Sequence, residues 1–154
     1  MPWLRRSIGL LLALLLPTIP GLAAGPGPVL FFAVLSADEQ SATTESPGTG
    51  RADFSLDRGS LRLRWKVSFG RLTSSAIGAH IHGPQRPGTN AGVQVDLGQK
   101  PLRSPLQGAA ILTDAQLQYL LAGRMYVNIQ TSRYPAGELR GQIQRGPPAG
   151  PTGN

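Results

Sequence analysis

The chain has only two histidines, and they lie two residues apart, at His80 and His82. In an extended strand, residues two apart project to the same face, so both imidazoles face one side. Imidazole is a ligand for copper and zinc, but such a site needs at least one more nitrogen, sulfur or carboxylate ligand. The chain has no cysteine. His80 and His82 are therefore candidate ligands of a copper or zinc site, which Glu138, Asp96 or Asp53 would have to complete.

A structural role for the two histidines is the alternative, and it is the one that we favour. His80 and His82 would then donate hydrogen bonds to carbonyl or carboxylate groups and fix the turn at Gly83 and Pro84. If the histidines are structural, the protein carries no cofactor. Copper or zinc is expected only if they are metal ligands.

A second pair with the same spacing is formed by Glu138 and Arg140, whose opposite charges are expected to pair on one face of a strand. If Asn128 projects to the same side from a neighbouring strand, these residues form one polar cluster with His80 and His82. We expect this cluster at one end of the molecule. It would be either a latch that ties strands together or a recognition patch for a partner, and we favour the latch.

Positive charges recur at every second residue in Arg62, Arg64 and Lys66, so they form a row on one face of a strand. Such a row suits an anionic polymer, as would be bound by an envelope or matrix protein. Charges on the wet face of a sheet also guard against aggregation, which is the more ordinary role.

Catalytic signatures are missing from the sequence. It contains no Gly-x-Ser-x-Gly elbow, no phosphate-binding loop, no dinucleotide fingerprint and no His-Glu-x-x-His motif,. We therefore predict that the protein is not an enzyme. Aromatic residues that would stack on bases are not interleaved with the basic ones, so nucleic acid is not an expected partner.

The elements that position these residues are mostly strands. Residues 61 to 69 alternate between apolar and polar, and residues 52 to 56 do the same across a turn that contains Gly59, which predicts a hairpin. One helix is expected over 113–121, because Thr113 and Gln116 form a capping box and Gly123 follows. The pattern predicts an all-β antiparallel sandwich of seven to nine strands, like an immunoglobulin domain or superoxide dismutase. The other expected strands are 29–35, 77–83, 92–97, 106–112, 125–130 and 139–144.

The N-terminus has the features of a secretory signal peptide. Arg5 and Arg6 precede a short apolar run over 8–16, and prolines and small residues follow,. The expected organisation is a signal peptide over 1–24, a flexible segment over 25–28, one domain over 29–145 and a disordered tail rich in proline and glycine over 146–154. Such a protein would be secreted or periplasmic and would not span a membrane after cleavage. Without Arg5 and Arg6 the formal charge falls from +7 to +5.

Two motifs identify a family resemblance: Ala-His-Ile-His-Gly-Pro over 79–84, and Tyr-Val-Asn at 126–128 followed by Pro-Ala-Gly-Glu-Leu-Arg-Gly-Gln over 135–142. In this combination the chain resembles the CHRD (chordin) domain family, in its free-standing microbial form. The resemblance implies a non-catalytic, extracytoplasmic binding module. Its partner would be an extracytoplasmic protein or an anionic polymer. Where the family pattern usually carries a further histidine, this chain has Gln130, which removes a metal ligand.

Overall fold

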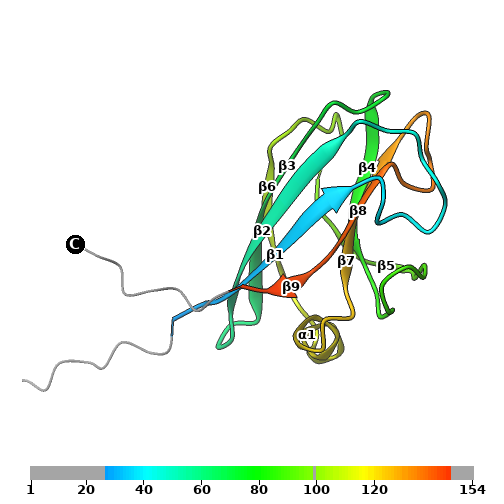
Figure 1. The fold of residues 1–154 in the computed structure, drawn as a ribbon. Helices are drawn as coiled ribbons and strands as arrows, with labels where there is room; N and C mark the ends of the chain where they lie inside the picture. The colour runs from blue at the N-terminus through cyan, green and yellow to red at the C-terminus, as the bar shows by residue number, and fades with distance from the viewer. Residues whose placement is uncertain (1–26, 99, 147–154) are drawn as a thin grey trace, which may run out of the picture.

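The computed structural model describes residues 27–98 and 100–146. The described residues form nine strands and one helix (Figure 1). The strands are β1 (Val29–Ser36), β2 (Thr49–Asp57), β3 (Arg62–Gly70), β4 (Ala76–His82), β5 (Val93–Asp96), β6 (Leu106–Ile111), β7 (Tyr126–Thr131), β8 (Leu139–Gln142) and β9 (Gln144–Arg145), and the helix is α1 (Asp114–Leu121).

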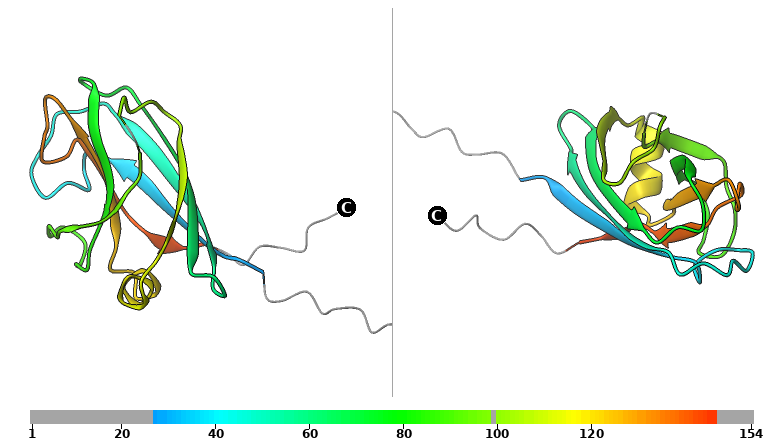
Figure 2. Two further views of the ribbon diagram at one scale, coloured as in Figure 1. Left: turned by 180° about the vertical axis from the view of Figure 1, so that it is seen from behind. Right: turned by 90° about the horizontal axis from the view of Figure 1, so that it is seen from above.

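All strand pairs are antiparallel, and eight strands follow the order β5-β4-β7-β8-β1-β2-β3-β6, with β9 paired to β1. The sheet curls around its own interior, as the view from above in Figure 2 shows, so that β5 and β6 approach each other at the two ends of the order. Near this junction the indole Nε1 of Trp65 donates to the carbonyl oxygen of Leu97 over 3.0 Å. The predicted all-β antiparallel class, with one short helix, is confirmed.

The core follows directly from the alternating pattern of the predicted hairpin. Across β2 and β3, Phe54 lies opposite Trp65 and Leu56 lies opposite Leu63, and all four are buried. Each such side chain contributes about 1.5 to 3 kcal/mol through removal from water. Facing apolar side chains come from the other strands, including Ile81, which lies on the face of β4 opposite its two histidines.

The turn of this hairpin differs from the expectation. Asp57 Oδ1 accepts hydrogen bonds of 2.9 Å from the backbone N–H groups of Gly59 and Ser60. The left-handed backbone conformation occurs at Leu61, with φ of 54°, and Gly59 does not adopt it. The aspartate side chain, rather than the glycine, therefore shapes the turn.

The helix begins as the sequence indicates. Thr113 Oγ1 accepts from the N–H of Gln116, and the Gln116 side chain accepts from the N–H of Thr113, which completes the capping box. Gly123 follows at φ of 67°, where a side chain would be strained,. The helix covers one end of the barrel (Figure 1), and Leu120 is its buried residue.

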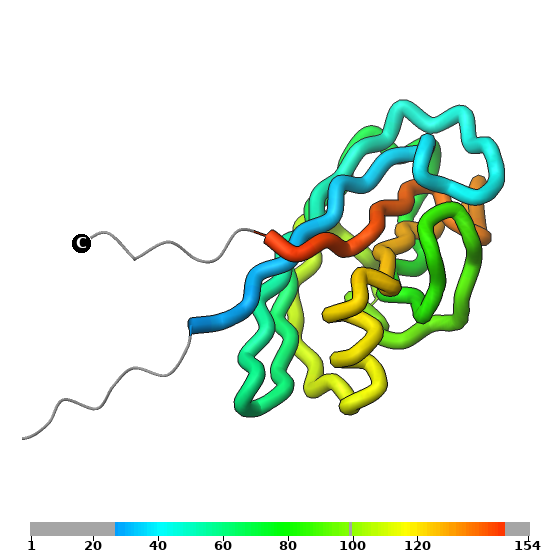
Figure 3. The backbone as a smooth tube through the Cα atoms, turned by 60° about the horizontal axis from the view of Figure 1, so that its bottom comes forward, coloured from blue at the N-terminus to red at the C-terminus, as the bar shows by residue number. Residues whose placement is uncertain are grey.

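The two ends of the described chain meet, since β1 and β9 lie side by side (Figure 3) and the N–H of Gly146 donates to the Leu30 carbonyl oxygen. The predicted signal peptide over 1–24 and nearly all of the predicted tail lie outside the described residues. Among the described residues, no helix has the length and apolar character needed to cross a membrane.

Candidate functional site

Three neighbouring strands bring most of the predicted polar residues together. In the register of β4, β7 and β8, His80 lies opposite Asn128, and Asn128 lies opposite Arg140. His82 lies opposite Tyr126 in the next row. Side chains alternate along each strand, so these residues share the face that points away from the core. The structure therefore gathers His80, His82, Asn128 and Arg140 on one polar face.

Tyr126 is the centre of this face. The ring of His82 stacks on it, with ring centroids 5.2 Å apart and an angle of 9° between the planes. The guanidinium carbon of Arg140 lies 3.6 Å from the centroid of the Tyr126 ring. Tyr126 and Arg140 are each only 1% exposed. A desolvated contact between a cation and an aromatic ring is worth about 2 kcal/mol, so the stack holds β7 and β8 together.

The stack also fixes the loop between β4 and β5. The N–H of Ala91 donates to the Tyr126 hydroxyl over 2.9 Å, and the Ala91 carbonyl oxygen lies 2.9 Å from His82 Nδ1. Arg140 donates to the carbonyl oxygen of Thr89 over 2.8 Å and to Oδ1 of Asn90 over 3.2 Å. Three side chains of the sheet thus anchor three consecutive residues of this loop.

Burial determines the charge of His82. It lowers the pKa of His82 below 6.5, and the nearby charges of His80 and Arg140 act in the same direction, whereas the bond to Ala91 acts against them. Because a carbonyl oxygen only accepts hydrogen bonds, the bond to Ala91 places the proton on Nδ1. His82 is therefore a neutral imidazole at pH 7, with the lone pair on Nε2.

A second loop, between β1 and β2, is held by Asn128. Gln40 Nε2 donates to Asn128 Oδ1 over 2.9 Å, and Asn128 Nδ2 donates to the Ala136 carbonyl oxygen over 3.0 Å. Ser41 Oγ bonds to Asn90 Oδ1 over 3.0 Å, which joins this loop to the one held by Arg140. We call the loops over 37–48 and 84–92, which these contacts join, the paired loops.

Glu138 does not belong to this face. Its carboxylate accepts hydrogen bonds from Ser46 Oγ (2.6 Å), Thr73 N (2.7 Å), Thr73 Oγ1 (2.8 Å) and Thr131 Oγ1 (2.6 Å). Thr131 projects from β7 to the side opposite Asn128, because the two are an odd number of residues apart. Gly137, with φ of 137°, changes the chain direction just before Glu138, and β8 begins only at Leu139.

The predicted ion pair between Glu138 and Arg140 is therefore wrong. Within 27–98 and 100–146, the one ion pair is Arg51 with Asp53, at 2.8 Å. Burial acts to raise the pKa of the Glu138 carboxyl, but the hydrogen bonds from Ser46, Thr131 and Thr73 outweigh burial and hold the pKa below its ordinary value. Glu138 is completely buried as an anion that is stabilised by dipoles,.

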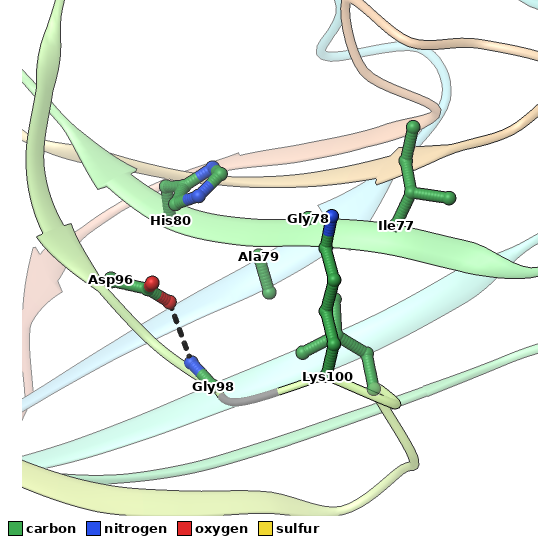
Figure 4. A pocket seen from close by; sticks show the side chains of 8 residues that line it. Ile77, Gly78, Ala79, His80, Asp96, Gly98 and Lys100 are labelled. Atoms are coloured by element: carbon green, nitrogen blue, oxygen red, sulfur yellow. Dashed lines mark hydrogen bonds between the residues drawn. The ribbon is translucent and has the colours of Figure 1, made fainter.

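Glu138 is thus unable to complete a metal site with His80 and His82. No three histidine, aspartate or glutamate side chains gather as a metal site anywhere in the described part of the chain. His80 lies at the edge of a cavity of about 330 Å³, which β4 shares with the segment that follows β5. Figure 4 shows His80 and Asp96 at this cavity, with Lys100 across from them. Asp96 accepts a hydrogen bond from Gly98, and Asp53 lies on β2, in the ion pair with Arg51.

The predicted basic row lies on the outer face of β3, where Arg62, Arg64 and Lys66 are all exposed. It has acidic neighbours, because Arg62 is opposite Asp57 and Lys66 is opposite Asp53 on β2. Hydrogen bonds from Ser60 are the main cause that lowers the pKa of Asp57, and Arg64 adds to the effect. Acidic side chains of β2 therefore lie beside the row, but within the described residues they form no ion pair with it.

Sequence reasoning missed the central position of Tyr126 and the donors to Glu138. Tyr126 is an even number of residues from Asn128, so the period of the strand places it on the polar face. Ser46 and Thr73 lie in irregular segments, where no periodic signal exists.

Comparison with known protein families gives one match. A family model described as the CHRD domain matches residues 31–143, which is most of the chain. The match spans β1 to β8 and therefore includes the polar face, the paired loops and Glu138. Neither the curated proteins nor the solved structures that were searched gave a match.

Proposed function

The chain belongs to the CHRD domain family, and from this premise we propose that it is an exported binding module in which a buried polar network fixes the paired loops as the recognition surface. CHRD domains are non-catalytic and typically extracellular. In this chain the polar face would serve the architecture of the domain, and the paired loops would serve binding.

The burial of Arg140 carries the proposal. The residue is 1% exposed, and its guanidinium is occupied by Thr89, Asn90 and the ring of Tyr126. A recognition patch would leave such donors free for a partner, whereas these donors are directed at the protein's own loop. The polar face is therefore the latch, and what it holds in place is the loop surface outside it.

A latch of this kind favours binding because ordering a loop costs free energy. Ordering one residue costs about 1 to 2 kcal/mol in backbone entropy alone. If the paired loops are ordered before a partner arrives, that cost is already met during folding and does not reduce affinity. The bond between Ser41 and Asn90 makes the two loops one continuous surface.

Export is the second part of the proposal. The predicted signal peptide over 1–24 supports it, and so does the typical location of CHRD domains. Expression of the full chain with a C-terminal tag, followed by mass spectrometry of the exported protein, tests this part. We expect a mature N-terminus at residue 24 or 25, and a chain that keeps residues 1–24 in the cytoplasm would contradict it.

Partner capture tests the role of the loops. The purified protein is cross-linked to the extracytoplasmic fraction of the producing cells, and captured molecules are quantified for the wild type, Arg140→Met and Arg64→Met. Arg140→Met keeps a long side chain but releases Thr89 and Asn90, so we expect at least a tenfold lower yield of the same partner. Arg64→Met should capture as well as the wild type.

The opposite outcome would change the function. Equal capture by Arg140→Met and the wild type would contradict the role of the paired loops. Loss of capture in Arg64→Met, together with binding that falls steeply with salt, would instead favour an envelope or matrix protein that binds anionic polymer through Arg62, Arg64 and Lys66.

A further inference from the structure

One long edge of the sheet has no neighbouring strand. β6 is the last strand in the order (Figure 1), and among the described residues it pairs only with β3. Proteins usually protect such an edge with charges, proline or a bulge, but residues 106–111 carry no charge and no proline, and their register with β3 is unbroken. The segment after β5 approaches the buried start of β6, where a Cβ on Gly98 would lie 3.1 Å from the Leu106 side chain. Residues 107, 109 and 111 are exposed, so the edge is open there.

The register shows which backbone groups of β6 face this open edge. The N–H of Leu112 donates to the Leu61 carbonyl oxygen over 2.9 Å, one residue pair beyond the end of the β3–β6 ladder. In an antiparallel ladder, every second residue bonds to the partner strand, and the residues between them direct their N–H and C=O groups away from it. The backbone groups of Gln107, Ala109 and Ile111 therefore point away from β3, toward the open edge.

The basic row of β3 runs beside this edge. Its three side chains are exposed, and among the described residues none of them forms an ion pair, since Asp53 on β2 pairs with Arg51 instead. The row shares the outer face of the sheet with the side chains of the exposed β6 residues. We call the open edge of β6 and this row together the basic edge. Each basic residue lies opposite one exposed residue of β6: Arg62 opposite Ile111, Arg64 opposite Ala109, and Lys66 opposite Gln107.

The spacing of the basic edge suits an extended acidic segment. Its charges recur at every second residue, about 6.5 to 7 Å apart, and carboxylates at alternate positions of a strand have the same spacing. A strand added to β6 would lie about 5 Å from β6 and about 10 Å from β3. Ala109 is the small residue between, so its methyl group leaves room for Arg64 and a partner carboxylate to meet above it.

A second copy of this chain fits the basic edge less well than an acidic segment does. Antiparallel pairing of β6 with its own copy would bring a second basic row to the same face of the sheet, and β6 itself supplies no carboxylate to offset it. Like charges on neighbouring strands oppose pairing. Complementary charge therefore favours a partner with carboxylates.

We propose that the basic edge captures an extended partner segment with acidic residues at alternate positions, as an antiparallel strand added to β6. The outward N–H and C=O groups of residues 107, 109 and 111 supply the backbone hydrogen bonds, and the basic row selects the charge of the partner. The basic edge is a different surface from the paired loops, so this proposal does not depend on their role.

Binding of a synthetic peptide to the purified protein tests the proposal. The probe is the fluorescently labelled peptide Thr-Glu-Val-Glu-Val-Glu-Thr with blocked ends, and its control has the same composition with the three glutamates next to one another. The wild type should bind the probe saturably and at least tenfold more tightly than the control. In amide hydrogen exchange measured by NMR, the probe should slow residues 107, 109 and 111, whereas residues 108 and 110, which already bond to β3, should not change.

Two variants separate strand pairing from simple charge attraction. Ala109→Pro removes an outward N–H that makes no bond to β3, and its ring obstructs the added strand, whereas an edge strand tolerates proline at such a position. We expect its melting temperature to stay within a few degrees of the wild type and its affinity for the probe to fall at least tenfold. Arg64→Met should weaken binding about twofold to fivefold. The matched Arg133→Met removes an exposed charge beyond β7 and should bind the probe like the wild type.

Methylated probes give a test that needs no variant to fold. In antiparallel addition the glutamate amides of the probe face β6 and the valine amides face away, so N-methylation of the glutamates should abolish binding and N-methylation of the valines should not. The proposal is overturned if the wild type shows no saturable binding or if the two methylated probes bind alike. It is also overturned if folded Ala109→Pro binds the probe as well as the wild type while Arg64→Met does not, since the row would then attract any anionic polymer by charge alone.

Discussion

Replacement of Glu138 by alanine should cost far more stability than its position near the surface loops suggests. The carboxylate is the common acceptor for four donors from three segments: Ser46 in the first of the paired loops, Thr73 after β3, and Thr131 on β7. Thr44 Oγ1 also donates to the Glu138 carbonyl oxygen over 3.3 Å. Removing the carboxylate therefore loosens several connections at once.

The size of this loss of stability depends on which of the four donors can form a hydrogen bond to water instead. Ser46 and the Thr73 hydroxyl are half-buried, so water can replace the carboxylate for them. The Thr73 N–H has a fixed direction, and Thr131 is completely buried. Each buried donor that is left unmet costs about 1 to 3 kcal/mol, so Glu138→Ala should lower the free energy of unfolding by about 2 to 6 kcal/mol. The exposed Arg64→Ala should change it by about 0.5 kcal/mol or less.

Urea denaturation at pH 7 measures both variants, and acid titration gives an independent check. The folded pKa of Glu138 is depressed, so its contribution to stability is complete above the ordinary value of 4.5 and is lost as the pH falls through the folded pKa,. Glu138→Gln should therefore lose stability at pH 7 and show a weaker dependence on pH below 4.5. Equal unfolding free energies for Glu138→Ala and Arg64→Ala would refute the reasoning.

Three further predictions concern the polar face and the barrel. The folded pKa of His82 lies below 6.5, so its contribution to stability is complete above pH 6.5 and falls as the pH drops through the folded pKa,. His82→Phe keeps an aromatic ring against Tyr126 and should lose this part of the pH dependence in denaturation measurements. Arg140→Lys should speed amide hydrogen exchange in residues 89–91, because a lysine lacks the planar fork that bonds to two groups at once,. Gly108→Ala should lower the melting temperature and cost about 1 to 3 kcal/mol, because a Cβ would lie 2.6 Å from the Trp65 ring,. The matched Gly70→Ala has nothing within 4 Å of its Cβ and should not destabilise.

Period-two alternation predicts that His80 and His82 share one face of their strand, and the register of β4, β7 and β8 adds Asn128 and Arg140 to that face,. The capping box likewise fixed the start of α1 at Thr113. Both patterns involve residues that are close in sequence, so they can be recognised without knowledge of the tertiary structure.

Alternation failed where the chain leaves the regular strand. Alternation predicts Glu138 on the face of Arg140, but the backbone at Gly137 takes φ of 137° and turns the carboxylate toward Thr131. The expected single strand over 139–144 is interrupted at Ile143, whose N–H donates to the carbonyl oxygen of Met125, the residue before β7. The chain then continues as β9, which pairs with β1. Such contacts join residues distant in sequence, and no local pattern records them.

Amide hydrogen exchange at Ala91 and Thr73, measured by NMR on the wild type, tests the locking of the loops most directly. Both residues lie outside strands, and each amide donates to a side chain of the network, Ala91 to Tyr126 and Thr73 to Glu138. We predict exchange as slow as in the central strands, with Tyr126→Phe accelerating Ala91 alone because it removes only the hydroxyl acceptor. Exchange of both wild-type amides at the rate of an unstructured peptide would contradict the account.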